Sequence, residues 1–159
     1  MNKFLFIIAV SICFVGVSQN KTVSKLNWIE SFSDAKSIAL KENKPMLILF
    51  TGSDWCKYCK NLTTDFFNSD KFKEIAQTDF VLYKADFPRN KSLVTENQKR
   101  DNLELKVMFG VNLYPTIYII NSKGKSIDNI KGYSSARDTK YHYMFIESAL
   151  NKNNKESTK

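Results

Sequence analysis

The chain has 159 residues and a formal net charge of +8, and 43% of its residues are hydrophobic. This length and apolar content suit one globular domain, and they argue against a disordered chain or two separate domains. Its lysines are scattered among acids and it has only three arginines, so we expect no nucleic acid partner.

The first 18 residues have the pattern of a secretory signal peptide. Lys3 precedes an uncharged apolar run, and small residues, Gly16 and Ser18, stand just before a suitable cleavage point. The run is shorter than the roughly 20 residues that a membrane-spanning helix needs. We predict a cleaved signal peptide over 1–18, no stable membrane anchor, and a periplasmic or otherwise secreted protein. A buried N-terminal helix is the alternative.

Apolar spacing, capping residues and breakers predict the elements after a short lead-in over 19–25. In chain order we first expect a helix from Ser31 or Ser33 to about 43, a strand over 46–50, a helix from Cys56 to about 68, and a second helical piece from 69 or 70 to 76. A strand over 80–86, a polar stretch over 87–97 and a helix over 96–109 should follow. The last elements are a strand over 116–120, a turn over 121–124, a returning strand over 125–130 and a helix over 136–150.

This order predicts an α/β fold with a central mixed β-sheet and helices on both faces. We place the domain at 26–150. The last nine residues, 151–159, are polar, so we expect a disordered tail there.

The stretch FTGSDWCKYCK, residues 50–60, puts two cysteines directly after a predicted buried strand. Removal of the signal peptide would also remove Cys13 and leave Cys56 and Cys59 in a compartment where disulfides persist. A zinc site would need four ligands, and these two cysteines with His142 are too few, so we expect no metal. A purely structural disulfide remains possible, although closing so short a loop stabilises a fold by only about 2 kcal/mol.

A redox centre is the third interpretation, and it uses the neighbouring residues. A thiol at the first turn of a helix faces free backbone N–H groups, which favour its thiolate form. We therefore expect Cys56 to be the nucleophile and Cys59, one turn on, to be the more buried resolving thiol. Lys57 adds a cation, while Trp55 and Tyr58 offer apolar surface to a polypeptide or simply pack.

The sequence resembles the thioredoxin superfamily in its strand, WCKYCK motif and helix, and in the later segment Leu113-Tyr114-Pro115-Thr116 that opens a strand. In detail it is similar to the secreted bacterial thioredoxin-like proteins. The resemblance implies a thioredoxin fold, a cis proline at Pro115 beside the disulfide, and pairing of an extended substrate with the backbone at Tyr114. It implies no cofactor other than the Cys56–Cys59 disulfide.

Two positions depart from the thioredoxin pattern. Counting back from Trp55, the usual buried carboxylate falls at Phe50, and Asp54 is the nearest acid. We therefore expect Asp54, water or the substrate to assist deprotonation of Cys59. Lys57 and Tyr58 fill the tuning positions between the cysteines, and their effect on the reduction potential stays open.

The resulting hypothesis is an exported, monomeric protein disulfide oxidoreductase, a reductase or isomerase rather than an oxidase. Its partners would be protein thiol or disulfide clients and an unidentified redox donor or acceptor. The alternatives are a client-binding or chaperone module on a thioredoxin scaffold and, third, a role in cytochrome maturation.

Overall fold

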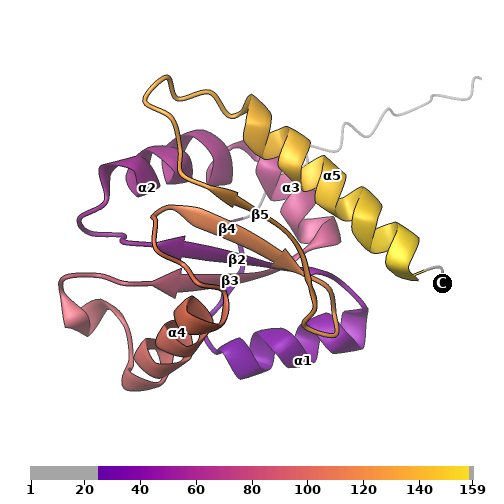
Figure 1. Cartoon of the computed structure of the whole chain (residues 1–159), viewed down its shortest axis with the longest axis horizontal. Helices are drawn as coiled ribbons and strands as arrows, with labels where there is room; N and C mark the ends of the chain where they lie inside the picture. The colour runs from indigo at the N-terminus through magenta and orange to yellow at the C-terminus, as the bar shows by residue number, and fades with distance from the viewer. Residues whose placement is uncertain (1–24, 158–159) are drawn as a thin grey trace, which may run out of the picture.

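The computed structural model describes residues 25–157, so the predicted signal peptide lies outside the described residues. Five strands form one mixed sheet (Figure 1) with the spatial order β1-β3-β2-β4-β5. Strand β3 pairs in parallel with β1 and β2, whereas β4 is antiparallel to both β2 and β5. The strands are β1 (Trp28–Ile29), β2 (Met46–Thr51), β3 (Val81–Asp86), β4 (Thr116–Ile120) and β5 (Ser126–Lys131).

Helices cover both faces of this sheet, which confirms the predicted fold class. Helices α1 and α4 lie on one face, and α2, α3 and α5 lie on the other (Figure 1). The helical segments are α1 (Phe32–Glu42), α2 (Lys57–Leu62), the π-helical η1 (Thr63–Phe67), α3 (Asp70–Asp79), the 3-10 turn η2 (Lys91–Leu93), α4 (Glu96–Met108) and α5 (Lys140–Ser157).

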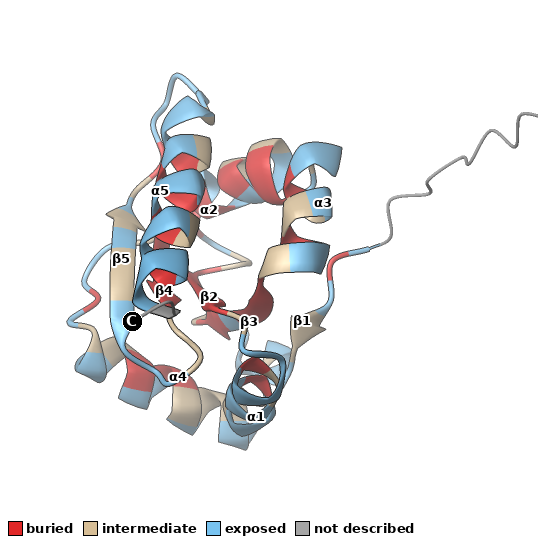
Figure 2. Ribbon diagram, turned by 90° about the vertical axis from the view of Figure 1, so that its right-hand side faces the viewer, coloured by how far each residue is buried: buried red, intermediate tan, exposed pale blue. Residues whose placement is uncertain are grey.

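Both faces of β2 and β3 carry apolar side chains, which explains why helices pack on both faces of the sheet. Every residue of β2 is buried, and alternate side chains enter different halves of the core. Phe50 and Tyr83 pack towards α1 and α4. Leu47 and Leu49 pack with Phe66 on the side of α2, α3 and α5. Figure 2 shows these buried faces turned inward between the helical layers.

Side-chain caps fix where the helices begin. Ser31 Oγ accepts a hydrogen bond from the Asp34 N–H, and Ser69 Oγ accepts one from the Phe72 N–H. Thr95 and Gln98 form a reciprocal capping box at the start of α4. These caps agree with the helix starts expected at Ser31 and Ser69.

The sequence analysis did not predict β1, a two-residue strand at the start of the predicted domain. Its expectation of a disordered tail is wrong for the described residues. Residues 151–157 belong to α5 and are not a disordered tail. The polar composition of this segment misled the sequence analysis, because Lys152 and Glu156 pair with Asp128 and Lys125 at β5 and its preceding turn.

Candidate active site

The two cysteines lie where β2 passes into α2. The turn between β2 and α2 is closed by the Cys56 N–H, which donates to the Gly52 carbonyl oxygen at 2.9 Å. Gly52 leaves room for the Trp55 indole, since a Cβ at this position would lie 2.4 Å from a ring carbon. The strand end, the glycine and the tryptophan therefore set the position of Cys56.

Cys56 and Cys59 form a disulfide with a Cα–Cα distance of 5.2 Å. Cys56 is the N-cap residue of α2, and the Cys59 N–H donates to its sulfur at 3.2 Å. Cys56 is 6% exposed and Cys59 is 2% exposed. A donor directed at Cys56 Sγ favours a thiolate there once the pair is reduced.

Pro115 follows a cis peptide bond, as expected. It is buried at the start of β4, and its carbonyl oxygen accepts a hydrogen bond from the Gly132 N–H. The neighbouring Tyr114 ring lies edge-on to Trp55, with centroids 5.9 Å apart, and beside Phe87 at 5.4 Å. The loops before α2, after β3 and before β4 therefore meet in one aromatic cluster.

The residues flanking the cysteines are the exposed part of this region. Trp55 is 39% exposed and Tyr58 is 46% exposed, and Lys57 is also exposed. The Trp55 indole N–H donates to the Phe87 carbonyl oxygen at 2.9 Å. Trp55 is therefore held in place, while its outer edge remains accessible.

The Asp54 carboxylate organises the segment after β3. Its two oxygens accept hydrogen bonds from the N–H groups of Arg89 and Asn90, at 3.0 and 2.8 Å. The bond from Asn90, with a smaller one from Arg89, lowers the pKa of Asp54 below its usual value. Asp54 is thus a carboxylate that binds the loop after β3.

Asp86 is a buried carboxylate that the sequence analysis missed. It ends β3, is 5% exposed, and accepts a hydrogen bond from the Ser53 N–H at 2.9 Å. The Asp86 carbonyl oxygen accepts another from the Asn102 side chain of α4. Its position at the end of a predicted strand, in the segment Asp86-Phe87-Pro88, was the available signal. Asp86 ties the cysteine loop to β3.

Phe50 does not occupy the place that counting from Trp55 assigned to it. Its ring packs against Phe109 and Tyr118, at 6.2 and 6.0 Å, on the face of α1 and α4. The neighbouring residues Leu49 and Thr51 share a cavity wall with Cys59. A change of one residue in loop length reverses the face that a strand residue presents, which explains the error.

The cavity beside Cys59 has a volume of about 320 Å³. Hydroxyl groups and lysines form much of its polar wall; its lining includes Thr51, Ser53, Lys60, Thr63 and Lys84. A polar cavity therefore adjoins Cys59 on the side of α2, whereas Phe50 packs on the other face of the sheet. None of Thr51, Thr63 and Lys84 was singled out from the sequence.

Asp65 connects the cysteine-bearing helical segment to the chain after β5. It accepts hydrogen bonds from the Tyr133 hydroxyl and the Arg137 Nε, both at 2.8 Å. The Arg137 bond, followed by the Tyr133 bond, lowers the pKa of Asp65. Burial, with help from Asp65, raises the pKa of Tyr133 to about 12. This network holds η1 on the scaffold.

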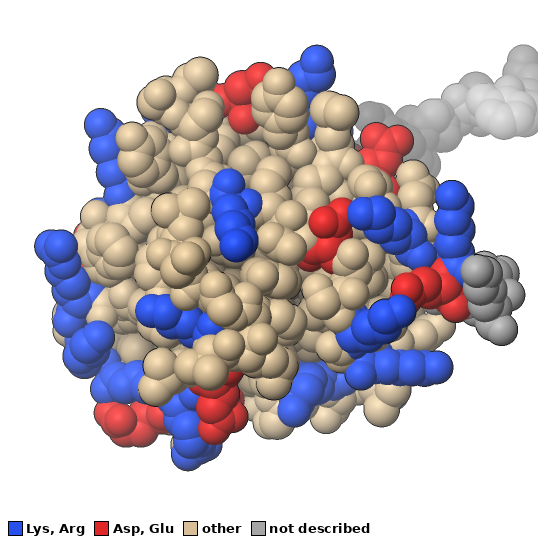
Figure 3. All heavy atoms as spheres, viewed as in Figure 1, with Lys and Arg blue, Asp and Glu red and all other residues tan. Residues whose placement is uncertain are grey.

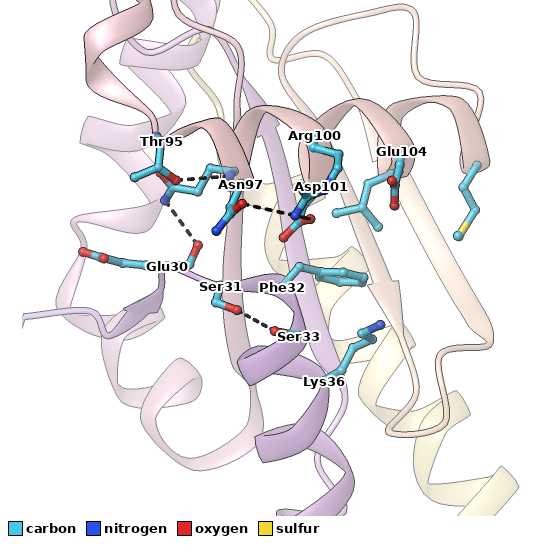
Figure 4. Close-up of a pocket in the computed structure, with 13 residues that line it drawn as sticks. Glu30, Ser31, Phe32, Ser33, Lys36, Thr95, Asn97, Arg100, Asp101 and Glu104 are labelled. Carbon is cyan, nitrogen blue, oxygen red and sulfur yellow. Dashed lines mark hydrogen bonds and ion pairs between the residues drawn. The ribbon is translucent and has the colours of Figure 1, made fainter.

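A second hollow lies away from the cysteines, between the first half of α1 and the length of α4 (Figure 4). It has a volume of about 440 Å³ and is lined by charges of both signs, including Lys36, Arg100, Asp101 and Glu104. The Gln98 side chain donates to the Glu30 carbonyl oxygen across it. Its mixed charge indicates no particular ligand.

Residues 25–157 contain no group of three or more His, Cys, Asp or Glu side chains that could hold a metal ion. His142 lies in α5, packed between Phe66 and Tyr133 at ring distances of 5.5 and 5.3 Å. Within the same described range, no helix combines the length and apolar character needed to cross a bilayer.

A family model described as a thioredoxin-like domain matches residues 32–144. The chain belongs to the thioredoxin-like family. This membership fits the sheet order, the disulfide at the start of α2 and the cis proline before β4.

Two curated relatives of this thioredoxin-like chain come from Chlamydia pneumoniae. It is 33% identical over 104 residues to the disulfide bond reductase DsbH, covering 65% of this chain and 61% of DsbH. It is 23% identical over 149 residues to the thioredoxin-related protein DsbJ, covering 91% of this chain and 42% of DsbJ. The chain thus spans less than two thirds of the length of either relative.

Solved structures agree with this family. A structure described as DsbH oxidoreductase matches with a TM-score of 0.73 and 28% identity, covering 85% of this chain and 92% of that one. A putative disulphide isomerase from Bacteroides thetaiotaomicron matches with a TM-score of 0.55 and 26% identity, covering 77% and 94%. These structures share the thioredoxin-like fold of the chain.

Proposed function

We propose that the protein is an exported thiol–disulfide oxidoreductase that reduces or isomerises disulfides in other proteins. The observation that carries the proposal is the Cys56–Cys59 disulfide at the start of α2, in a member of the thioredoxin-like family. The names of DsbH and its structural counterpart, a reductase and an oxidoreductase, support the same chemistry.

The reaction begins from the reduced pair. The Cys56 thiolate attacks one sulfur of a client disulfide, a mixed disulfide forms, and the second client sulfur leaves as a thiolate that takes a proton from solvent. Cys59 loses its proton to water in the adjoining cavity and attacks Cys56 Sγ. The Cys56–Cys59 bond forms as the bond between Cys56 and the client breaks, and the client sulfur leaves as a thiolate that takes a proton from solvent. Two electrons have then passed to the client. A thiol donor restores the dithiol.

The surrounding residues have supporting roles in this proposal. Trp55, Tyr58 and Tyr114 form the surface that a client chain contacts, next to Pro115. Lys57 adds positive charge close to the Cys56 thiolate. Asp54 acts by holding the loop after β3. The disulfide is the only redox group required, and the protein acts as a monomer.

Trapping the mixed disulfide tests this function directly. Cys59→Ser removes the resolving thiol, so it should accumulate covalent adducts with client proteins that dithiothreitol releases. Cys56→Ser, which keeps Cys59, is the matched control and should trap none. If Cys59→Ser forms no adduct and reduced Cys56 does not react with a thiol probe, the protein is not an oxidoreductase. If adducts form, the reduction potential of the Cys56–Cys59 pair decides whether the protein is a reductase or an oxidant.

Export is tested by expressing the full chain in a bacterial host. The proposal expects a shorter chain, cut after the pattern over 1–18, outside the cytoplasm. Retention of full-length chain in the cytoplasm would contradict export while leaving the thiol chemistry intact.

Exposed apolar groups beside the cysteines favour one alternative, a client-binding module without turnover. Trp55, Tyr58 and Leu113 are each exposed by more than a third. Such a module should protect an unfolded client equally well after both cysteines are changed to serine. An oxidoreductase with both cysteines changed to serine should no longer reduce or isomerise client disulfides.

A further inference from the structure

Aromatic rings form a continuous surface from the cysteines to α4. Trp55 contacts Tyr114, and Tyr114 contacts Phe87. These three rings come from the loops that meet around the disulfide. A client segment attacked by Cys56 must pass close to them, because Trp55 adjoins Cys56 and Tyr114 adjoins Pro115.

Two cations lie on this aromatic surface. The Arg89 guanidinium lies over the Trp55 ring, 5.6 Å from its centroid. The Lys106 ammonium, from α4, lies 5.4 Å from the centroid of Phe87 and 5.6 Å from that of Tyr114. Contact with a ring face holds each cation in place without neutralising its charge.

The two acids at these loops bind backbone N–H groups. Asp54 accepts the N–H groups of Arg89 and Asn90, and Asp86 accepts that of Ser53. Further cations follow these loops in the sequence: Lys57 and Lys60 in α2, and Lys91 in η2. Figure 3 shows Lys and Arg side chains along its left edge, where β2 and β3 end in Figure 1, with acids gathered only at the lower part of that edge.

We propose that this cationic aromatic surface selects clients whose disulfide lies in an acidic, extended segment. Carboxylates beside the client cysteine would meet Arg89 and Lys106, while the chain crosses Trp55 and Tyr114. This inference rests on the proposed function, because it names the substrate class of the same site. Opposite charge at the rim of a binding surface mainly speeds association and excludes wrong partners.

The test uses two matched peptides, each with one disulfide, whose cysteines are flanked by glutamates or by glutamines. The pre-reduced full chain reduces each peptide in a single turnover, and the rates are compared at low and high salt. At low salt the glutamate peptide should react about 10-fold faster, the low end of the rate increase that electrostatic steering gives. The advantage should shrink at high salt, because exposed charges are screened.

Paired variants assign the preference to the two cations. Arg89→Gln with Lys106→Gln should bring the ratio of the two rates close to one, whereas Arg89→Lys with Lys106→Arg should keep the preference. Lys41→Gln with Lys123→Gln removes the same charge at the opposite end of the sheet, where Ser122 contacts Asn43, and should not alter the ratio.

The outcomes separate the two proposals. If the wild type reduces both peptides at equal rates, or if the glutamine variants at 89 and 106 keep the preference, the acidic-client inference is wrong and the oxidoreductase stands. If reduced wild type acts on neither peptide, the proposed function itself fails.

Discussion

Gly52 is the position at which one added methyl group should most clearly disturb the site. A Cβ at residue 52 would lie 2.4 to 2.6 Å from three atoms of the Trp55 ring, well inside contact distance. The indole is held in three ways that Gly52→Ala would disrupt. It donates to the Phe87 carbonyl, contacts Tyr114 edge-on, and lies beneath Arg89.

The cost of Gly52→Ala follows from those three contacts. The hydrogen bond contributes about 1 kcal/mol, the aromatic pair about 0.5–1.5 kcal/mol, and the cation–π contact about 0.5–1 kcal/mol. Replacing glycine also restricts the unfolded chain, which offsets about 0.4–1 kcal/mol. We expect the free energy of unfolding to fall by about 1–3 kcal/mol, within the range for overpacking.

Urea unfolding of the oxidised protein, followed by far-UV circular dichroism, measures this loss. Trp55→Ala removes the ring that the new methyl group would strike, so Gly52→Ala should cost almost nothing in that background. The quantity to compare is the change in unfolding free energy that Gly52→Ala causes with and without the Trp55 ring. If Gly52→Ala is equally destabilising with and without the Trp55 ring, its effect comes from the backbone and the steric reasoning is refuted.

Two further predictions concern titration and loop anchoring. Burial lowers the pKa of His142 below its usual value of 6.5, with a Gly132 backbone group acting the opposite way, so the unfolded chain takes up the proton first as pH falls. The free energy of unfolding should therefore decrease below about pH 6.5 by at most ~1.4 kcal/mol per pH unit. Urea unfolding at several pH values measures this decrease, and His142→Phe should make it smaller. An unchanged slope would show that His142 does not cause the decrease. Asp86→Ala should lower the free energy of unfolding by about 1–3 kcal/mol, because it leaves the partly buried Ser53 N–H without its acceptor. Asp86→Asn should cost less because an amide oxygen remains, and equal losses, or unchanged hydrogen exchange at Ser53, would count against this role.

The sequence predicted the elements that have strong local signals. The apolar run of β2, the serine caps of α1 and α3, and the Cys56 helix start all depend on neighbouring residues, and the structure places them as expected. The cis bond before Pro115 followed from the family resemblance. These features could be found without knowing which segments meet in space.

The features that were missed depend on tertiary contacts. The end of α5 is supported by ion pairs to Asp128 and Lys125, which a composition-based tail prediction ignores. The face of Phe50 depends on the path of the following loop, since adjacent strand residues point in opposite directions. The role of Asp86 depends on Ser53, which is far away in the sequence and donates to its carboxylate.

The cavity beside Cys59 gives the two sulfurs different surroundings for exchange with solvent. The aromatic residues that would receive a client do not line the cavity; they are Trp55, Tyr58, Phe87 and Tyr114. In the proposed reaction, a client docked on these rings would leave the cavity lined by Thr51 and Lys84 uncovered. Proton transfer from Cys59 would then take place on a different side of the disulfide from client docking.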